Sequence, residues 1–448
     1  MKSNSLVLFA ISFLGLFSAN GQEKTSLSLN EAVNIALSQS DESKLADSKV
    51  NTKAFELQST KMNQYPDFKL SGQYLRLTNA DVNLKSTQET SDNPDEGTRS
   101  ASPKVNQLII GQANINMPVF SGFKLRNSIL LSENTYQAEK AHSQYTKESL
   151  AMRVIEYYAD LYKAQKSVEL LEENLVSSNQ RVKDFSAMEQ NGLLARNDLL
   201  KAKLQSSQIE LSLAEAQKNV KLINYNLITL LKLKPNTLIV VSPDNVDANL
   251  FNFKTASENE ALNNRKDLEA LHFQQKAMEA GVKVAKSDYY PTVNLVGGYA
   301  YLDLQNVVRV ENAMNFGVGL SFNLSSIFKN GKQVKAAKSR LEETQHQEAV
   351  LTDYIKSQTV EAQENYALAQ KQDQVYKEAV EQTTENYRIV KDKYDNGLVD
   401  TNDLLDANVQ DLTAKINQAY AKANVVLKYY ELLNTTGQLT QSFNSTTN

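Results

Sequence analysis

Two spacings of hydrophobic side chains alternate along this chain, and each predicts a different kind of element. In two segments the apolar residues follow a 4-3-4-3 spacing, which is typical of helices that supercoil around a neighbour. These seam positions are Ile209, Leu213, Ala216, Val220, Ile223, Leu227 and Leu230 in the first segment and Leu412, Ile416, Ala419, Ala423, Val426, Tyr430 and Leu433 in the second. Between the helical segments the period falls to two, as in strands with one apolar face. The clearest such strand alternates Phe316, Val318, Leu320, Phe322 and Leu324 with small or polar residues.

The spacing of glycine and proline predicts two very long helices. Neither residue occurs between Gly122 and Gly192 or between Gly331 and Gly397, and good helix formers fill both windows. Each window allows about 65 helical residues, or roughly 95–100 Å at 1.5 Å per residue. The shorter helical segments sum to about the same length, so we expect two short helices stacked end to end beside each long one.

Short matches between the two halves of the chain indicate an internal duplication. They occur in the same order in both halves, which a chance match would not explain. The paired segments are 65–74 with 290–299, 121–122 with 330–331, 191–193 with 396–398, and 197–200 with 402–405. Each repeat is therefore predicted to contain, in this order, a helix, a pair of strands, a very long helix, a turn and a further helix.

The two periods and the duplication together set the expected element boundaries. We expect a first repeat over 22–237, a second repeat over 238–437 and a C-terminal tail over 438–448. In the first repeat the predicted helices are 30–38, 40–63, 124–190 and 198–231, and the strands are 67–77 and 107–118. In the second repeat the predicted helices are 257–264, 267–287, 332–395 and 403–433, and the strands are 292–302 and 314–324.

The first residues have the pattern of a secretory signal peptide. Lys2 precedes an apolar stretch over 6–17, and the small residues Ala19 and Gly21 fit a cleavage site. We therefore expect residues 1–21 to be removed on export, the alternative being a buried first helix. After Gln22 there is no run of 18 apolar residues that would predict a transmembrane helix. The exported protein is then expected to be either soluble or a β-barrel.

Composition narrows the possible chemistry. The chain has no cysteine, and its three histidines, His142, His272 and His346, stand in no ligand spacing. We therefore expect no metal, no cofactor and no enzymatic activity. The formal net charge of −4 also argues against nucleic acid as a partner.

The strands are long enough to cross an outer membrane. Tilted strands of about ten residues span the hydrocarbon layer, but four of them cannot close a barrel, because the smallest bacterial barrels have eight strands. An open sheet edge cannot face lipid, so several copies must share one barrel. The connections 78–106 and 303–314 would then be extracellular loops. A soluble sheet within an exported coiled-coil scaffold, with no pore, would produce the same alternation and is the alternative.

The duplicated order, the Tyr-Pro before each strand pair and the Gly-Leu turn followed by Asp-Leu-Leu resemble the TolC-like outer membrane efflux proteins, over about residues 27–437. The resemblance implies an α+β membrane protein and a homotrimer. Its four strands per protomer would contribute to a 12-stranded outer-membrane barrel, continued by a long antiparallel coiled-coil α-helical barrel in the periplasm. It implies the exit duct of a tripartite pump, with a periplasmic adaptor and an inner-membrane efflux transporter as partners. The transporter would select the substrate.

The resemblance also implies a gate at the periplasmic end. The matching residues are Asp403, Asp406 and Tyr394, whereas Val399 stands where some relatives carry an arginine. Asp403 and Asp406 are three residues apart and therefore share one helix face. The first repeat keeps Asp198 but has Lys201 at the second position, so its tip should be less acidic. The simpler alternative is that Asp403 caps or begins a helix, whose N-terminus favours negative charge.

Overall fold

The computed structural model describes residues 23–81, 104–241 and 257–444. The expected signal peptide, most of the 78–106 connection and the last four residues lie outside these ranges. The described chain forms two compact units, each built from segments of both halves of the sequence. One unit comprises 45–145 and 264–356, and the other comprises the segments up to 44, 146–263 and from 357 onward. The helices α3 (Lys124–Gln190) and α7 (Ser326–Asp395) contribute residues to both units.

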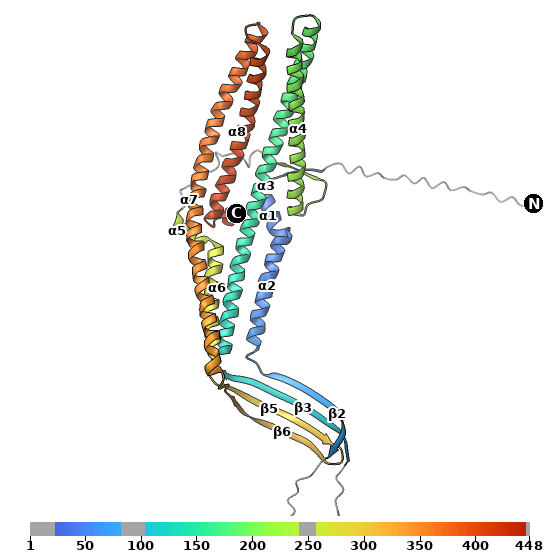
Figure 1. Ribbon diagram of the computed structural model, residues 1–448, viewed down its shortest axis with the longest axis vertical. Helices are drawn as coiled ribbons and strands as arrows, with labels where there is room; N and C mark the ends of the chain where they lie inside the picture. The colour runs from blue at the N-terminus through green and yellow to red at the C-terminus, as the bar shows by residue number, and fades with distance from the viewer. Residues whose placement is uncertain (1–22, 82–103, 242–256, 445–448) are drawn as a thin grey trace, which may run out of the picture. The chain divides into compact units, whose positions relative to one another are not determined.

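A four-stranded antiparallel sheet dominates the unit that comprises 45–145 and 264–356 (Figure 1). Its strands are β2 (Asp67–Asp81), β3 (Lys104–Ser121), β5 (Thr292–Leu304) and β6 (Val308–Ser321), in the order β2-β3-β5-β6. Each repeat supplies one hairpin. The helices of this unit are most of α2 (Asp41–Met62), α6 (Lys266–Ser287) and the first parts of α3 and α7.

The strands are longer than the sequence predicted. The 303–314 connection, expected to be a loop, is mostly strand, because β5 and β6 pair as far as Leu304 with Val308. A register shift between Ala300 and Leu302 accommodates Asn312, whose φ is +60°. In the same unit α7 begins at Ser326, six residues before the expected start, since Gly331 is accommodated within the helix.

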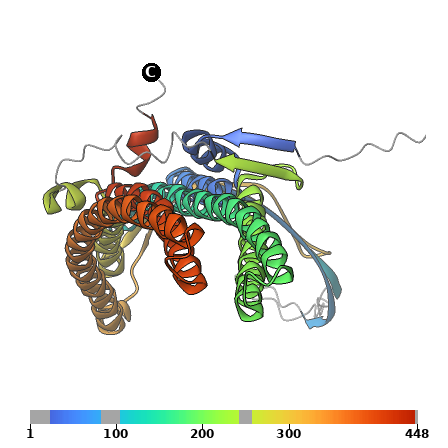
Figure 2. The ribbon, with the colours of Figure 1, turned by 90° about the horizontal axis from the view of Figure 1, so that it is seen from above.

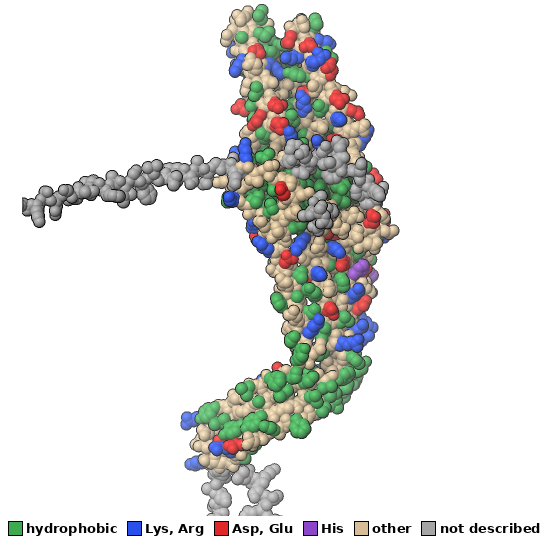
Figure 3. All heavy atoms as spheres, turned by 180° about the vertical axis from the view of Figure 1, so that it is seen from behind, with side chains coloured by type: hydrophobic (Ala, Val, Ile, Leu, Met, Phe, Trp, Pro, Cys, Tyr) green, Lys and Arg blue, Asp and Glu red, His purple; other side chains and the backbone are tan. Residues whose placement is uncertain are grey.

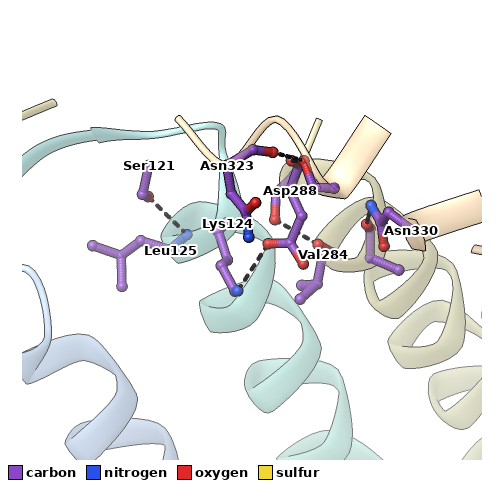
Figure 4. Close-up of polar contacts among 10 residues, drawn as sticks. Ser121, Lys124, Leu125, Val284, Asp288, Asn323 and Asn330 are labelled. Atoms are coloured by element: carbon purple, nitrogen blue, oxygen red, sulfur yellow. Dashed lines mark hydrogen bonds and ion pairs between the residues drawn. The ribbon is translucent and has the colours of Figure 1, made fainter. Parts of the chain in front are cut away.

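Polar contacts fix the junction where the strands meet the helices of this unit (Figure 4). The Lys124 ammonium lies 3.0 Å from a carboxylate oxygen of Asp288, and Leu125 donates its backbone N–H to the Ser121 hydroxyl. The amide nitrogen of Asn330 donates to the Ala285 carbonyl at 2.6 Å. Each contact joins the start of one long helix to the strand or helix beside it, so the junction is held from several sides.

Two helical hairpins make up most of the other unit. The later part of α3 pairs with α4 (Arg196–Leu231), and the later part of α7 pairs with α8 (Thr401–Thr435) (Figure 1). The coiled-coil prediction is confirmed, because the predicted seam is buried or packed against buried residues along both α4 and α8. In one cluster Ile209 and Leu213 of α4 pack with Leu412 of α8, which joins the two repeats.

This unit also contains short elements near the hairpin bases, several of which the sequence did not predict. β1 (Glu23–Leu27) pairs in parallel with β4 (Thr237–Val241), and Figure 2 shows the two strands side by side. α1 (Leu29–Gln39) buries Ala32, Val33 and Ala36 in the main core, and α5 (Glu258–Asn264) follows β4 in the chain. α9 (Leu439–Asn444) lies within the expected tail, where Leu439 and Phe443 are buried in the same core.

Candidate functional site

One face of the sheet is apolar and exposed. The register places Phe68, Ile115, Gly297 and Phe316 in one rung across all four strands, and Leu70, Ala113, Tyr299 and Met314 in another. Phe68 is 72 % exposed and Phe316 is 95 % exposed. An apolar surface of this extent suits contact with lipid hydrocarbon better than contact with water.

The opposite face of the sheet is polar or small. Its rungs include Lys69, Asn114, Gly298 and Asn315 in register. A Cβ atom on Gly298 would lie 2.8 Å from the Ala113 carbonyl oxygen, so only glycine fits between the neighbouring strands there. The alternation therefore gives the sheet one face for lipid and one for water. Among the residues that the structure describes, no helix is both long enough and apolar enough to cross a membrane.

The predicted gate residues lie at the ends of the α7–α8 hairpin. Gly397, with φ +71°, ends α7 and lets Leu398 donate its backbone N–H to the Lys393 carbonyl. Asp403 and Asp406 are both exposed in the first turns of α8, while Leu404 between them is buried. Across the described residues, neither carboxylate has a hydrogen bond or an ion pair with another side chain. Both are therefore available to a partner outside this protomer.

The structure corrects one part of the alternative view of Asp403: the residue does not cap α8, but it is the acidic residue in the first turn, where the helix N-terminus favours negative charge. The helix begins at Thr401, and Asp400 is its N-cap: its carboxylate accepts hydrogen bonds from the backbone N–H groups of Asn402 at 2.8 Å and Asp403 at 3.1 Å. The equivalent position in the first repeat is Ala195, which makes no side-chain cap. Capping therefore does not account for the side chain of Asp403, whereas its place in the first turn of α8 is consistent with the helix-dipole part of that alternative.

Tyr394 does not lie against the two carboxylates but packs into an apolar cluster between the repeats. Its ring stacks on Phe185 of α3 with centroids 5.7 Å apart, beside buried Leu199 and Leu404. Tyr394 therefore helps to hold the α7–α8 hairpin against α3 and α4.

Several polar contacts that the sequence did not reveal also link the two hairpins. Arg181 of α3 donates to the Tyr387 hydroxyl at 3.0 Å, and Gln205 of α4 donates to the Leu405 carbonyl at 3.2 Å. Lys201 donates to the Asn402 side chain at 2.9 Å. No motif could have revealed these contacts, because each joins residues about 200 positions apart. The contacts of Lys201 and Gln205 fasten the start of α8 to the first repeat, next to the two free carboxylates, and the contact of Arg181 fastens α7 to α3.

Protonating Asp400 should loosen the first turn of α8. The backbone N–H of Asp403, and then that of Asn402, lowers the pKa of Asp400 below its usual value. Because the folded-state pKa is depressed, this contribution is present above the unfolded pKa of about 3.9 and is lost as pH falls through the lower folded value. We expect Asp400→Ala to raise amide exchange at Asn402 and Asp403 about fivefold at neutral pH. Hydrogen exchange checks this, and Asp395→Ala, just before the turn, should leave those amides unchanged.

Comparisons with known proteins agree with this geometry. The family model described as "Outer membrane efflux protein" matches residues 56–231 and 258–438. The outer membrane efflux protein BepC of Brucella suis is 21 % identical over 347 residues, which cover 77 % of this chain and 75 % of BepC. The solved outer membrane channel CmeC of Campylobacter jejuni superposes with a TM-score of 0.79 at 16 % identity, covering 98 % of this chain and 94 % of CmeC. The open-state MtrE channel of Neisseria gonorrhoeae gives 0.73 at 16 % identity, covering 92 % and 89 %.

These results decide between the interpretations that the sequence left open. The protein is an outer-membrane channel that extends into the periplasm and forms the exit duct of an efflux system. The family consists of efflux channels rather than enzymes, and the scaffold without a pore is set aside. The match covers both repeats, and the chain therefore belongs to the outer membrane efflux protein family.

Proposed function

We propose that three copies of this chain form the duct, with their sheets completing one 12-stranded barrel. The observation that carries this proposal is the sheet itself: β2 and β6 are its edge strands, and its apolar face is exposed. An edge in lipid would leave backbone N–H and C=O groups without partners, and four strands are too few to close a barrel. Pairing β2 of one copy with β6 of the next removes every edge, and cyclic symmetry closes the ring.

The duct works with an inner-membrane efflux transporter and a periplasmic adaptor protein. Membership of the efflux family supports this assignment, because a passive duct needs a pump to deliver its substrate. The transporter selects the substrate and the duct conducts it outward.

Asp403 and Asp406 form the gate at the periplasmic end. Threefold symmetry places six carboxylates around the axis, where they attract cations and narrow the passage. Both carboxylates are unpaired within the described protomer, and the contacts of Lys201 with Asn402 and of Gln205 with Leu405 hold their helix in place. Opening requires the α7–α8 hairpin to leave the first repeat, and Tyr394 then separates from Phe185.

Single-channel recording in planar bilayers tests the gate. We expect Asp403→Asn with Asp406→Asn to weaken block by divalent cations about tenfold or more, because the ring loses its charge while keeping its size. Asp198→Asn, at the matching position of the first repeat, is the control. The Asp198 carboxylate already forms an ion pair with the Lys201 ammonium at 3.5 Å, so its charge is compensated within the chain. Unchanged block in the double variant would remove the gate assignment and leave the channel intact.

A further inference from the structure

A group of basic side chains borders the apolar face of the sheet, at the end where the helices begin. We call this group the basic collar: Lys124, Arg126, Lys283, Lys286, Lys329, Lys332, Lys335, Lys338 and Arg340. Within 124–132, 283–288 and 326–341, Asp288 is the single acidic residue. The collar therefore carries a strong positive charge on a chain whose net charge is −4.

The collar is continuous with the lipid-facing surface. Beyond β6 the exposed apolar residues continue through Leu324, at 67 % exposure, to Phe328, at 87 %. Lys332 and Lys335 follow Phe328 at i+4 and i+7, so the three side chains share one stripe of α7, and both lysines are exposed. Figure 3 shows Lys and Arg side chains gathered beside the green apolar face at this end of the sheet. Cationic groups thus stand one to two helical turns from the hydrocarbon boundary.

Three of these charges, Lys124, Arg126 and Lys329, lie in or next to the first turns of α3 and α7, where the helix dipole opposes them, whereas Lys283 and Lys286 lie at the C-terminal end of α6. α3 and α7 both begin at this junction, and neither has an acidic residue in its first turn. Basic groups near a helix N-terminus are unfavourable, because that end carries a partial positive charge. Lys124 pairs with Asp288, and no other collar residue has a carboxylate partner within the described chain. An anion from outside the protein would relieve both the dipole and the mutual repulsion.

A pocket beside the collar could hold a hydrocarbon chain. It is lined mainly by apolar side chains, among them Phe120, Phe123 and Ile129, and Arg126 also lines it. Phe120 and Phe123 meet edge to face with centroids 5.3 Å apart, and Phe123 meets Tyr290 in the same way at 6.1 Å. Gln64, Ser121 and Arg126 make the rest of the lining polar, so the pocket offers both apolar contact for the start of an acyl chain and polar groups for a phosphate nearby.

We infer that the basic collar binds the headgroup phosphates of anionic phospholipids in the periplasmic leaflet of the outer membrane. The sheet lies in that membrane and the helices extend into the periplasm, so the collar meets the leaflet on that side. Charge complementarity and continuity with the lipid-facing strands both select a membrane lipid as the occupant. The inference rests on the outer-membrane location and not on the gate or on the partner proteins.

Lipid retention measured by mass spectrometry tests the collar. Protein equilibrated in mixed micelles of phosphatidylglycerol and phosphatidylethanolamine should keep phosphatidylglycerol preferentially. In the variant Lys332→Gln with Lys335→Gln, the ratio of retained phosphatidylglycerol to phosphatidylethanolamine should fall about fivefold for each lysine removed. The control variant is Lys371→Gln with Lys377→Gln, the same charge change at exposed positions of α7 in the other unit. It should retain lipid as the unchanged protein does.

Three results would overturn the inference. One is an equal lipid ratio in the lysine variant and the unchanged protein, both with the same helical circular dichroism. Another is complete displacement of phosphatidylglycerol by millimolar inorganic phosphate at constant ionic strength, which would show a site for free anions. The third is preferential retention of lipopolysaccharide at the same lysines, which would place the collar at the other leaflet. Gate conductance is measured separately, so failure of one proposal leaves the other standing.

Discussion

Gly122→Ala is expected to lower the free energy of unfolding by about 3–5 kcal/mol. Gly122 has φ +61°, and a Cβ atom there would lie 2.5 Å from the Ser287 carbonyl oxygen and 2.8 Å from the Tyr290 Cβ. The left-handed backbone costs a non-glycine residue about 1–2 kcal/mol, and overlap with a backbone atom adds to that cost because the backbone cannot rotate away. The midpoint of thermal unfolding, followed by circular dichroism in detergent at fixed protein concentration, checks this.

Gly192→Ala is the matched control for the change at Gly122. Gly192 has a similar φ of +72°, yet a Cβ atom there would meet nothing within 4 Å. The control should therefore cost only the backbone term of about 1–2 kcal/mol. Equal losses at Gly122 and Gly192 would show that backbone strain, and not the crowded junction, decides the effect.

The junction matters because only a few side-chain contacts connect the lipid-facing sheet to the long helices. Gly122 packs against the C-terminal end of α6. The carboxylate of Asp288, at the same end, forms an ion pair with Lys124, and its backbone carbonyl accepts a hydrogen bond from the Ser326 hydroxyl. Moving α6 would disturb the starts of both α3 and α7. A single added methyl group thus acts at a junction where strands and helices of both repeats meet.

The long elements could be predicted from the sequence because their signals are long. The seam from Ile209 to Leu230 repeats through several turns, and burial along α4 follows it. The alternation of β6 likewise identified the face on which Phe316 and Val318 are exposed. The resemblance to the efflux family, and not the residue pattern alone, implied Asp403 and Asp406 as gate residues, and their gating role stays a prediction; the duplication only aligned Asp403 with Asp198.

The short helices α1 and α5 agree with the predicted helices 30–38 and 257–264, but the strands β1 and β4, the helix α9 and the helix caps could not be predicted, because tertiary contacts decide them. The sequence predicts that the helix begins after Gly331, at 332, but α7 runs through Gly331, and Asn330 beside it donates to the Ala285 carbonyl. Asp400 and Asp403 both fit an N-cap by residue type, and only the backbone geometry identifies Asp400. α9 is six residues long and is placed by the burial of its apolar side chains.

The clearest example is β4, which two amide side chains hold in place. Asn224 of α4 donates to the Thr237 carbonyl at 2.9 Å and accepts from the Ile239 N–H at 2.9 Å. Gln165 of α3 contacts the next two residues of this edge in the same way: its amide nitrogen donates to the Ile239 carbonyl at 2.7 Å, and its amide oxygen accepts from the Val241 N–H at 3.3 Å. The other edge of β4 pairs with β1. These five residues show no alternation of apolar and polar side chains. They form a strand because helix side chains provide the hydrogen bonds along one edge and β1 provides those along the other.

Asn224→Ala should accordingly cost about 2–5 kcal/mol, because it leaves one backbone carbonyl and one backbone N–H without partners at about 1–3 kcal/mol each. Asn224 is only 8 % exposed, so water cannot readily replace the amide. Asn219→Ala, at an exposed position on the same helix, makes the same chemical change and should be neutral. Thermal unfolding measures the cost, and hydrogen exchange at Ile239 should rise in the first variant alone. Equal stability of the two variants would mean that β4 is held by β1 and by burial of Ile239, and that the amide ladder is dispensable.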